Sequence, residues 1–215
     1  LELRGQGEKF DLFLNFFDKW PMMLFWDPGL LFRQEHFVAT HNSVIDWATQ
    51  GLVSVHLPSW VDSSHFSLKI ELLCPEMQAL YAFAETQLRE YKHTAEEWQT
   101  ERSGQLNTDD EYFNGIEAPI LIKSLQRFTG DPTIREIEIQ KYPAHRISLY
   151  SYYTRSYQTR KPISVNDVID VMISGFTAYA DIIITEAFQA NTLKKAKRFI
   201  SGFKPENILV LSDIR

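Results

Sequence analysis

The stretch from Ser164 to Leu211 alternates helical and strand-like patterns, and this alternation leaves few possible fold classes. Ser164 is followed three residues later by Asp167, which is the spacing of a capping box and predicts a helix start. The β-branched run DIIIT at 181–185 is typical of a buried parallel strand. Residues 188–200 are helical again, and ILVL at 208–211 predicts the next strand. The order helix, strand, helix, strand favours an α/β fold with a parallel sheet.

Acidic side chains stand where a site is expected in such a fold. Asp167 and Asp170 share one face of the first helix, opposite an apolar stripe that contains Val168 and Met172. Glu186 follows the strand, and sites in open α/β sheets gather at the carboxyl ends of strands. Divalent ions relieve the repulsion between crowded carboxylates. Helix capping explains Asp167 equally well, and a charge at a helix N-terminus is the structural alternative for Glu186.

This pattern resembles the PIN-like nuclease family. The resemblance rests on Asp170, on Asp181 eleven residues later in the sequence YAD, and on the strand IIIT with Glu186 directly after it. It extends more weakly to LLFRQEHF, where the family has a glutamate on an earlier helix and Glu35 fits that role. The resemblance implies that Asp170, Glu186 and Glu35 are catalytic ligands of Mg²⁺ or Mn²⁺. Asp167 is then a further member of the same acidic cluster.

The resemblance also implies a fold, a three-layer PIN-like domain with a parallel sheet. The family opens with a strand that ends in an aspartate, and no segment before Glu35 resembles that strand. We therefore expect residues 1–215 to form a single domain whose first strand lies upstream of Leu1. Helical periodicity over 76–102 and 118–128 predicts a long helical insertion at 76–128.

The activity that the resemblance implies is that of a bacterial, metal-dependent endonuclease whose products carry a 5′-phosphate. RNA or single-stranded nucleic acid is the expected substrate, with RNA favoured over DNA. A toxin, a defence effector and an RNA-processing enzyme all remain open as roles. The alternative is a catalytically degenerate module that binds nucleic acid or a protein partner without cleaving, and the absence of the first aspartate favours it.

Charge is distributed unevenly along the chain. Residues 1–140 hold 11 basic and 22 acidic side chains, whereas residues 141–215 hold 11 basic and 6 acidic side chains. A rim that contacts phosphates and ordinary solvated helix faces explain the basic stretches equally well. The acidic front part is a candidate surface for a protein partner or for a homo-oligomer. The candidate nucleic-acid contacts are Arg155, Arg160, Lys161, Lys194 and Lys195.

Several function classes are not expected. The six histidines form no HxxxH pair and Cys74 is the only cysteine, so no zinc site is predicted. No Gly-rich phosphate loop or GxSxG motif is present, which argues against nucleoside triphosphate hydrolysis and serine hydrolysis. No apolar run approaches the roughly 20 residues that cross a bilayer, and no secretory signal begins the chain. We therefore expect a cytoplasmic protein without a membrane span.

The remaining predicted elements follow from periodicity and turn residues. Helices are expected at 10–20, 30–39 and 144–157, a strand at 22–25, irregular structure at 51–66 and a loop at 103–115. The tyrosines of the helix at 144–157 could stack on bases, but a place in the core is the favoured interpretation.

Overall fold

The computed structural model of the chain describes residue 8 and residues 22–25, 28–45, 53–56, 74–101, 108–159, 162–210 and 212. The chain forms two compact units. One consists of residues 1–27 and 46–83, and the other of residues 28–45 and 84–215. The helix predicted at 10–20 lies outside the described residues, and so do Arg160 and Lys161.

In the first unit, a two-stranded antiparallel ladder is described. Strand β1 (Met22–Phe25) pairs with strand β2 (Val53–His56), and Met22 lies opposite His56. Strand β1 confirms the prediction at 22–25. The prediction of irregular structure at 51–66 is wrong for Val53–His56, where apolar and polar residues alternate with the period of a strand.

The second unit is rich in helices. Helix α4 (Cys74–Glu101) enters it at Ala84. The other elements are, in chain order, α2 (Pro28–His41), α5 (Asp109–Glu111), the π-helix η2 (Tyr112–Ile116), α6 (Glu117–Thr129), the 3₁₀ helix η3 (Ile139–Lys141), α7 (Pro143–Tyr153), the π-helix η4 (Thr154–Gln158), α8 (Val165–Ser174), the 3₁₀ helix η5 (Gly175–Tyr179), β3 (Ile182–Thr185), α9 (Ala187–Phe199) and β4 (Asn207–Val210). The predicted helices at 30–39, 76–102 and 118–128 are confirmed.

Part of the loop predicted at 103–115 is helical instead. Thr108 accepts a hydrogen bond from the backbone of Glu111, and the Glu111 carboxylate accepts one from the backbone of Thr108. This reciprocal pair is a capping box that starts α5. Tyr112 then begins η2 with a fully buried side chain. The polar composition of the stretch led to the prediction of a loop, although Thr108 and Glu111 have the spacing of a capping box.

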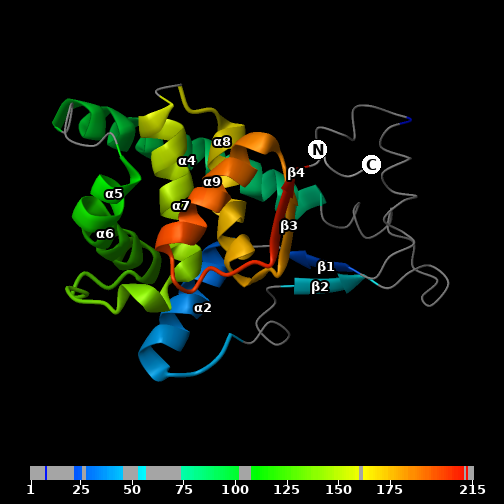
Figure 1. Cartoon of the computed structure of the whole chain (residues 1–215), viewed down its shortest axis with the longest axis horizontal. Helices are drawn as coiled ribbons and strands as arrows, with labels where there is room; N and C mark the ends of the chain where they lie inside the picture. The colour runs from blue at the N-terminus through cyan, green and yellow to red at the C-terminus, as the bar shows by residue number, and fades with distance from the viewer. Residues whose placement is uncertain are drawn as a thin grey trace. The chain divides into compact units, whose positions relative to one another are not determined.

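Helix α7 is the centre of the second unit, because nine of its eleven residues are buried. Helices α6, α8 and α9 pack around it (Figure 1). Tyr150, Tyr152 and Tyr153 are at most 3% exposed, which confirms that these tyrosines belong to the core. The π-helix η4 continues α7, and its Tyr157 stacks on Tyr153 with ring centroids 5.5 Å apart.

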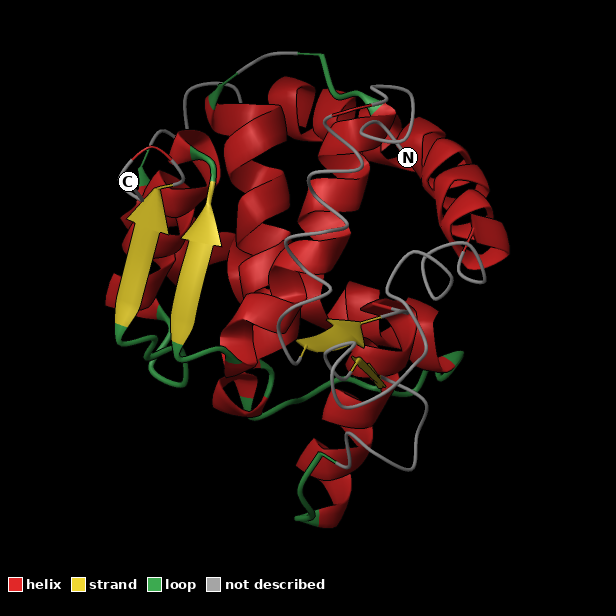
Figure 2. Ribbon diagram, turned by 90° about the vertical axis from the view of Figure 1, so that its right-hand side faces the viewer, coloured by secondary structure: helices red, strands yellow, loops and turns green. Residues whose placement is uncertain are grey.

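Strands β3 and β4 pair in parallel, with Ile183 opposite Ile208 (Figure 2). The predicted order of helix, strand, helix, strand is thus confirmed, as a small two-stranded sheet within a helix-rich α/β arrangement. Helix α9 packs against both strands, and Ile183 and Ile208 are buried. Ile182 and Ile184 are 55% and 52% exposed, so the prediction of a buried strand is confirmed for Ile183 and wrong for these two residues. Among the described helices, none is long and apolar enough to span a membrane.

Candidate functional site

A cavity of about 380 Å³ in the second unit brings together three of the predicted acids, and we call it the Arg155 cavity. Asp167 and Asp170 reach it from α8, and Glu186 reaches it from the junction between β3 and α9. Arg155 enters from the π-helix η4. The remaining lining residues are Thr159, Pro162, Ile163 and Phe188.

Arg155 lies at the centre of the acidic residues. Its Nη1 is 2.7 Å from Oδ1 of Asp167, and its Nη2 is 3.0 Å from Oδ2 of Asp170 and 3.5 Å from Oε1 of Glu186. Nη2 also donates to Oε1 of Gln189 at 3.2 Å. The guanidinium lies over the ring of Phe188, with Cζ 4.9 Å from the ring centroid. The side chain of Arg155 is only 9% exposed, so its charge is stabilised mainly by the acidic residues and not by water.

The backbone that presents Arg155 is locally widened. Helix α7 passes at Thr154 from α-helical into π-helical bonding, and π-helical turns are rare and often lie at functional sites. The hydroxyls of Thr154 and Ser156 donate back to the carbonyls of Tyr150 and Tyr152 at 2.9 and 2.7 Å. Side-chain bonds of this kind bend helices. The chain therefore has an identifiable local cause for the change of helical geometry at Arg155.

Asp167 caps α8, which is one of the two interpretations that the sequence left open, and it also pairs with Arg155, which was not predicted. Its Oδ2 accepts from the backbone and hydroxyl of Ser164 at 2.9 and 2.6 Å, which completes the predicted capping box of α8. Its Oδ1 accepts from Arg155. Burial acts to raise the pKa of Asp167, but the hydrogen bonds from Ser164 and Arg155 outweigh burial and hold that pKa below its usual value. Asp167 therefore stays ionised and fixes one end of the guanidinium.

Glu186 is at the N-cap position of α9, but its side chain makes no capping hydrogen bond. The carboxylate reaches Arg155 instead and is 59% exposed. Gln189, one turn into α9, donates to the Ser151 hydroxyl at 3.2 Å while it accepts from Arg155. The start of α9 thus supplies a charged and a neutral acceptor to the same guanidinium.

The cavity carries an excess of negative charge. Three carboxylates surround one guanidinium, which leaves a formal charge of −2. Among the described residues, no group of three or more His, Cys, Asp or Glu side chains is arranged to hold a metal ion. Asp170 and Glu186 nevertheless approach the same nitrogen of Arg155. Carboxylate oxygens are the ligands that Mg²⁺ and Mn²⁺ favour, so Asp170 and Glu186 fit a divalent ion in donor type and in charge.

Glu35 is not among the residues that line the Arg155 cavity. It lies on α2 with its side chain 1% exposed, and its carboxylate accepts from the backbone N–H groups of Ala144 and His145 at 2.7 and 3.0 Å. It also accepts from Nδ1 of His145 at 2.8 Å and from the hydroxyl of Tyr179 at 2.6 Å. Burial, followed by the charge of Glu35, raises the pKa of Tyr179. Glu35 thus caps the N-terminus of α7 from another helix.

The predicted nucleic-acid contacts are separated in the structure. Arg155 is buried and paired with acids, so a phosphate must compete for it. Lys194 and Lys195 are on α9, outside the residues that line the cavity. Lys194 is exposed, and Nζ of Lys195 is 3.8 Å from Oδ2 of Asp109.

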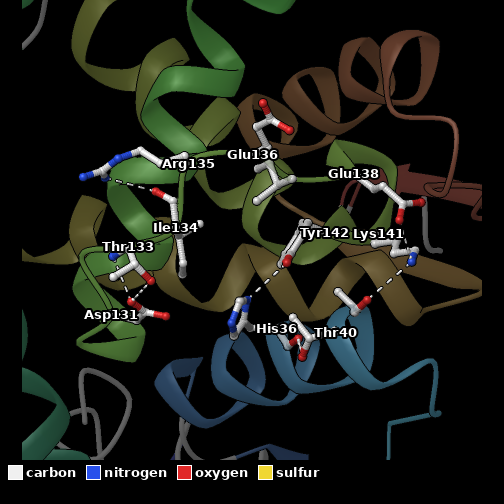
Figure 3. Close-up of a pocket in the computed structure, with 12 residues that line it drawn as sticks. His36, Thr40, Asp131, Thr133, Ile134, Arg135, Glu136, Glu138, Lys141 and Tyr142 are labelled. Atoms are coloured by element: carbon white, nitrogen blue, oxygen red, sulfur yellow. Dashed lines mark hydrogen bonds and ion pairs between the residues drawn. The ribbon is translucent and has the colours of Figure 1, made fainter.

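A second, open cavity of about 530 Å³ lies between α2 and the segment 131–142. Figure 3 shows His36 pointing at Tyr142, whose hydroxyl is 3.1 Å from Nδ1 of His36. Burial, followed by the nearby His145, lowers the pKa of His36. Several polar groups of this cavity already have partners in the protein: Asp131, for example, accepts from Thr133 at 2.8 and 2.6 Å. The geometry of this second cavity therefore does not call for a ligand.

Arg155 was predicted as a phosphate contact, and its position among the acids was missed. No local signal in the sequence connects it with Asp170 or Glu186. Phe188 and Gln189 were missed as well, although they lie only two and three residues after Glu186, at the start of the helix predicted at 188–200. No sequence pattern marked Thr159, Pro162 or Ile163 as residues of a site.

No protein-family model, curated protein or solved structure matches this chain. Function is therefore inferred from the residues of the Arg155 cavity, their geometry and their charge.

Proposed function

We propose that this protein is a divalent-metal-dependent nuclease that hydrolyses phosphodiester bonds of RNA or single-stranded nucleic acid in the Arg155 cavity. Asp170 and Glu186 are the metal ligands in this proposal, and Mg²⁺ or Mn²⁺ is the metal. The proposal includes a PIN-like three-layer fold, which the order of α8, β3, α9 and β4 supports.

The observation that carries the proposal is the convergence of Asp170 and Glu186 on one cation. These side chains come from different elements and lie 3.0 and 3.5 Å from Nη2 of Arg155. They are 41% and 59% exposed, so an ion can reach them from solvent. The residual charge of −2 in the cavity matches the charge of one divalent ion.

The chemistry needs few groups. Hydrolysis adds one water across a P–O bond and leaves a 5′-phosphate on one product and a hydroxyl on the other. A divalent ion supplies Lewis acidity, which favours attack by water and offsets the charge that develops on the phosphate. Asp170 and Glu186 fix the position of positive charge, and Arg155 can pair with a phosphate oxygen. Asp167 acts as a positioning residue, because it holds Nη1 of Arg155.

The test is the double variant Asp170→Asn, Glu186→Gln, which removes two charges and keeps the side-chain shapes. We expect Mn²⁺-dependent cleavage of labelled single-stranded RNA to fall by more than about 100-fold, since loss of outer-sphere partners alone costs about 10- to 100-fold. The matched control is Glu206→Gln, which neutralises an exposed carboxylate outside the cavity. Undiminished cleavage by a folded double variant would exclude the proposed ligands.

A second candidate function is a module that binds nucleic acid or a protein partner without cleaving. The position of Arg155 favours it, because the guanidinium already offsets part of the negative charge. Calorimetric titration of the full chain with Mn²⁺, in the presence of a saturating cleavage-resistant single-stranded RNA, separates the two functions. Binding that Asp170→Asn abolishes supports the nuclease, and absence of Mn²⁺ binding under these conditions supports the module.

A further inference from the structure

The Nε–H donor of Arg155 has no acceptor within the part of the chain that the structure describes. The Nε atom itself is buried. A buried donor without an acceptor destabilises the protein, because it has lost its hydrogen bond to water and gained none in return. The residue is nine-tenths buried and lines a cavity. An acceptor brought against Nε would remove this cost.

The two ends of the guanidinium are held differently. Nη1 has a short contact of 2.7 Å with Asp167, whose other oxygen is fixed by the capping box. Nη2 carries two hydrogens but has three oxygens near it, from Asp170 at 3.0 Å, Gln189 at 3.2 Å and Glu186 at 3.5 Å. These three acceptors compete for two hydrogens. The Nη2 end is therefore the one that can be drawn away, with Nη1 as its pivot.

The unused Nε and the shared Nη2 lie along the same edge of the planar guanidinium. Two parallel N–H groups on one edge match two oxygens of a phosphate, which is the bidentate pairing that distinguishes arginine from lysine. Phosphate oxygens thus satisfy Nε and relieve the crowding at Nη2 in one contact. When Nη2 turns toward a phosphate, Asp170 and Glu186 lose the cation between them.

We propose that Arg155 is an internal counter-ion that excludes the divalent ion until a substrate phosphodiester draws its Nε–Nη2 edge away from Asp170 and Glu186. This inference rests on the proposed function, because it assigns the metal to the same two carboxylates. The ligand is a phosphodiester of a single-stranded nucleic acid. Metal and nucleic acid then bind cooperatively, and each raises the affinity for the other by the same factor.

The test is calorimetric titration of the full chain with Mn²⁺, alone and with a saturating single-stranded oligoribonucleotide made resistant to cleavage by 2′-O-methyl groups. We expect the oligonucleotide to tighten Mn²⁺ binding by about 5- to 150-fold, the usual range of coupling between sites. Inorganic phosphate and a single-stranded DNA of the same length show whether a free phosphate or a DNA phosphodiester has the same effect.

Two variants identify Arg155 as the cause of the coupling. Arg155→Gln removes the counter-ion, so Mn²⁺ alone should bind at least about fivefold tighter than to the wild type, and the oligonucleotide should add nothing further. Arg155→Lys keeps a cation but lacks the planar edge, so Mn²⁺ should bind weakly with and without the oligonucleotide. If Arg155→Gln does not fold, Arg155→Lys still tests whether the coupling between Mn²⁺ and the oligonucleotide requires the guanidinium.

Several results would overturn the inference. Mn²⁺ binding to a folded Arg155→Gln variant that is no tighter than to the wild type contradicts the counter-ion. Full coupling in Arg155→Lys contradicts the bidentate edge. If Mn²⁺ binding requires Asp170 and Glu186 but its affinity is the same with and without the oligonucleotide, this inference is refuted and the proposed nuclease is not. Absence of Mn²⁺ binding in every sample refutes both.

Discussion

At the scale of single residues, Asp167 divides its two carboxylate oxygens between a helix cap and an ion pair. The hydrogen bonds lower its pKa in the folded protein. The unfolded chain therefore binds a proton at Asp167 more readily than the folded protein does. It follows that this residue stabilises the fold fully above the ordinary pKa of 3.8, and that the contribution is lost as pH falls through the lowered folded value.

We therefore predict that Asp167→Ala lowers the free energy of unfolding by about 1–3 kcal/mol at pH 7, from the lost cap and the lost charged hydrogen bonds. Urea unfolding of variant and wild type at pH 7 and near pH 3 measures the difference. It should shrink at the acidic pH, because the wild-type carboxylate is then increasingly protonated. The same difference at both pH values would show that its charge is not what stabilises α8. Glu206→Gln serves as the charge control.

Residue-level prediction worked where the partners are close in sequence. The capping box of α8 joins Ser164 and Asp167, three positions apart, and could be predicted from spacing alone. The partners of Glu35 are His145 and Tyr179, which are 110 and 144 positions away. Only tertiary packing brings His145 and Tyr179 to the carboxylate of Glu35. The helical pattern around Glu35 therefore gave no sign that this residue caps α7.

At the scale of secondary structure, α7 and η4 confirm the helix predicted at 144–157, but the change to π-helical bonding at Thr154 was not predicted. A periodicity of apolar residues predicts that a segment is helical, but it does not show where a turn contains one extra residue.

Helix α7 also forms a buried ion pair with α6. Nε and Nη2 of Arg146 donate to the two carboxylate oxygens of Glu117 at 2.7 and 3.1 Å, and both side chains are at most 4% exposed.

We predict that Arg146→Met destabilises the protein by about 3–5 kcal/mol, because it leaves the carboxylate of Glu117 buried without its cation. Burial already raises the pKa of Glu117 against the opposing effect of Arg146. The double variant Arg146→Met, Glu117→Leu removes both charges and should recover most of the loss. Urea unfolding of the wild type, the two single variants and the double variant measures the coupling free energy between Arg146 and Glu117. Equal destabilisation by the single and double variants would assign the effect to packing and not to charge.

At the scale of the whole molecule, the order of elements was predictable and the composition of the cavity was predictable only in part. The alternation of α8, β3, α9 and β4 could be read from residues 164–211, since each element has its own period. The pairing of Asp170 with Glu186 was implied by the resemblance to PIN-like nucleases, and in the structure both carboxylates lie near Nη2 of Arg155. Arg155 precedes the alternation and comes from a helix that the core of the second unit positions, so its place between the acids needed the structure.

The chain as a whole carries a formal charge of −6, so any affinity for nucleic acid has to come from a local basic surface. Outside the Arg155 cavity, the predicted contacts among the described residues are Lys194 and Lys195 of α9. Their role in binding rests on the proposed function. We predict that Lys194→Ala with Lys195→Ala weakens binding of a cleavage-resistant single-stranded RNA. If each lysine neutralises one phosphate, the slope of log affinity against log salt should become less steep by about 1.4.

Fluorescence anisotropy over a series of salt concentrations measures that slope. The control is Lys92→Ala with Lys123→Ala, which removes the same charge from exposed positions on α4 and α6. Because the net charge of both double variants is the same, a general electrostatic effect weakens binding equally in both. A loss confined to the α9 variant identifies α9 as part of the nucleic-acid surface. An unchanged slope in that variant would instead assign Lys194 and Lys195 to an ordinary solvated helix face.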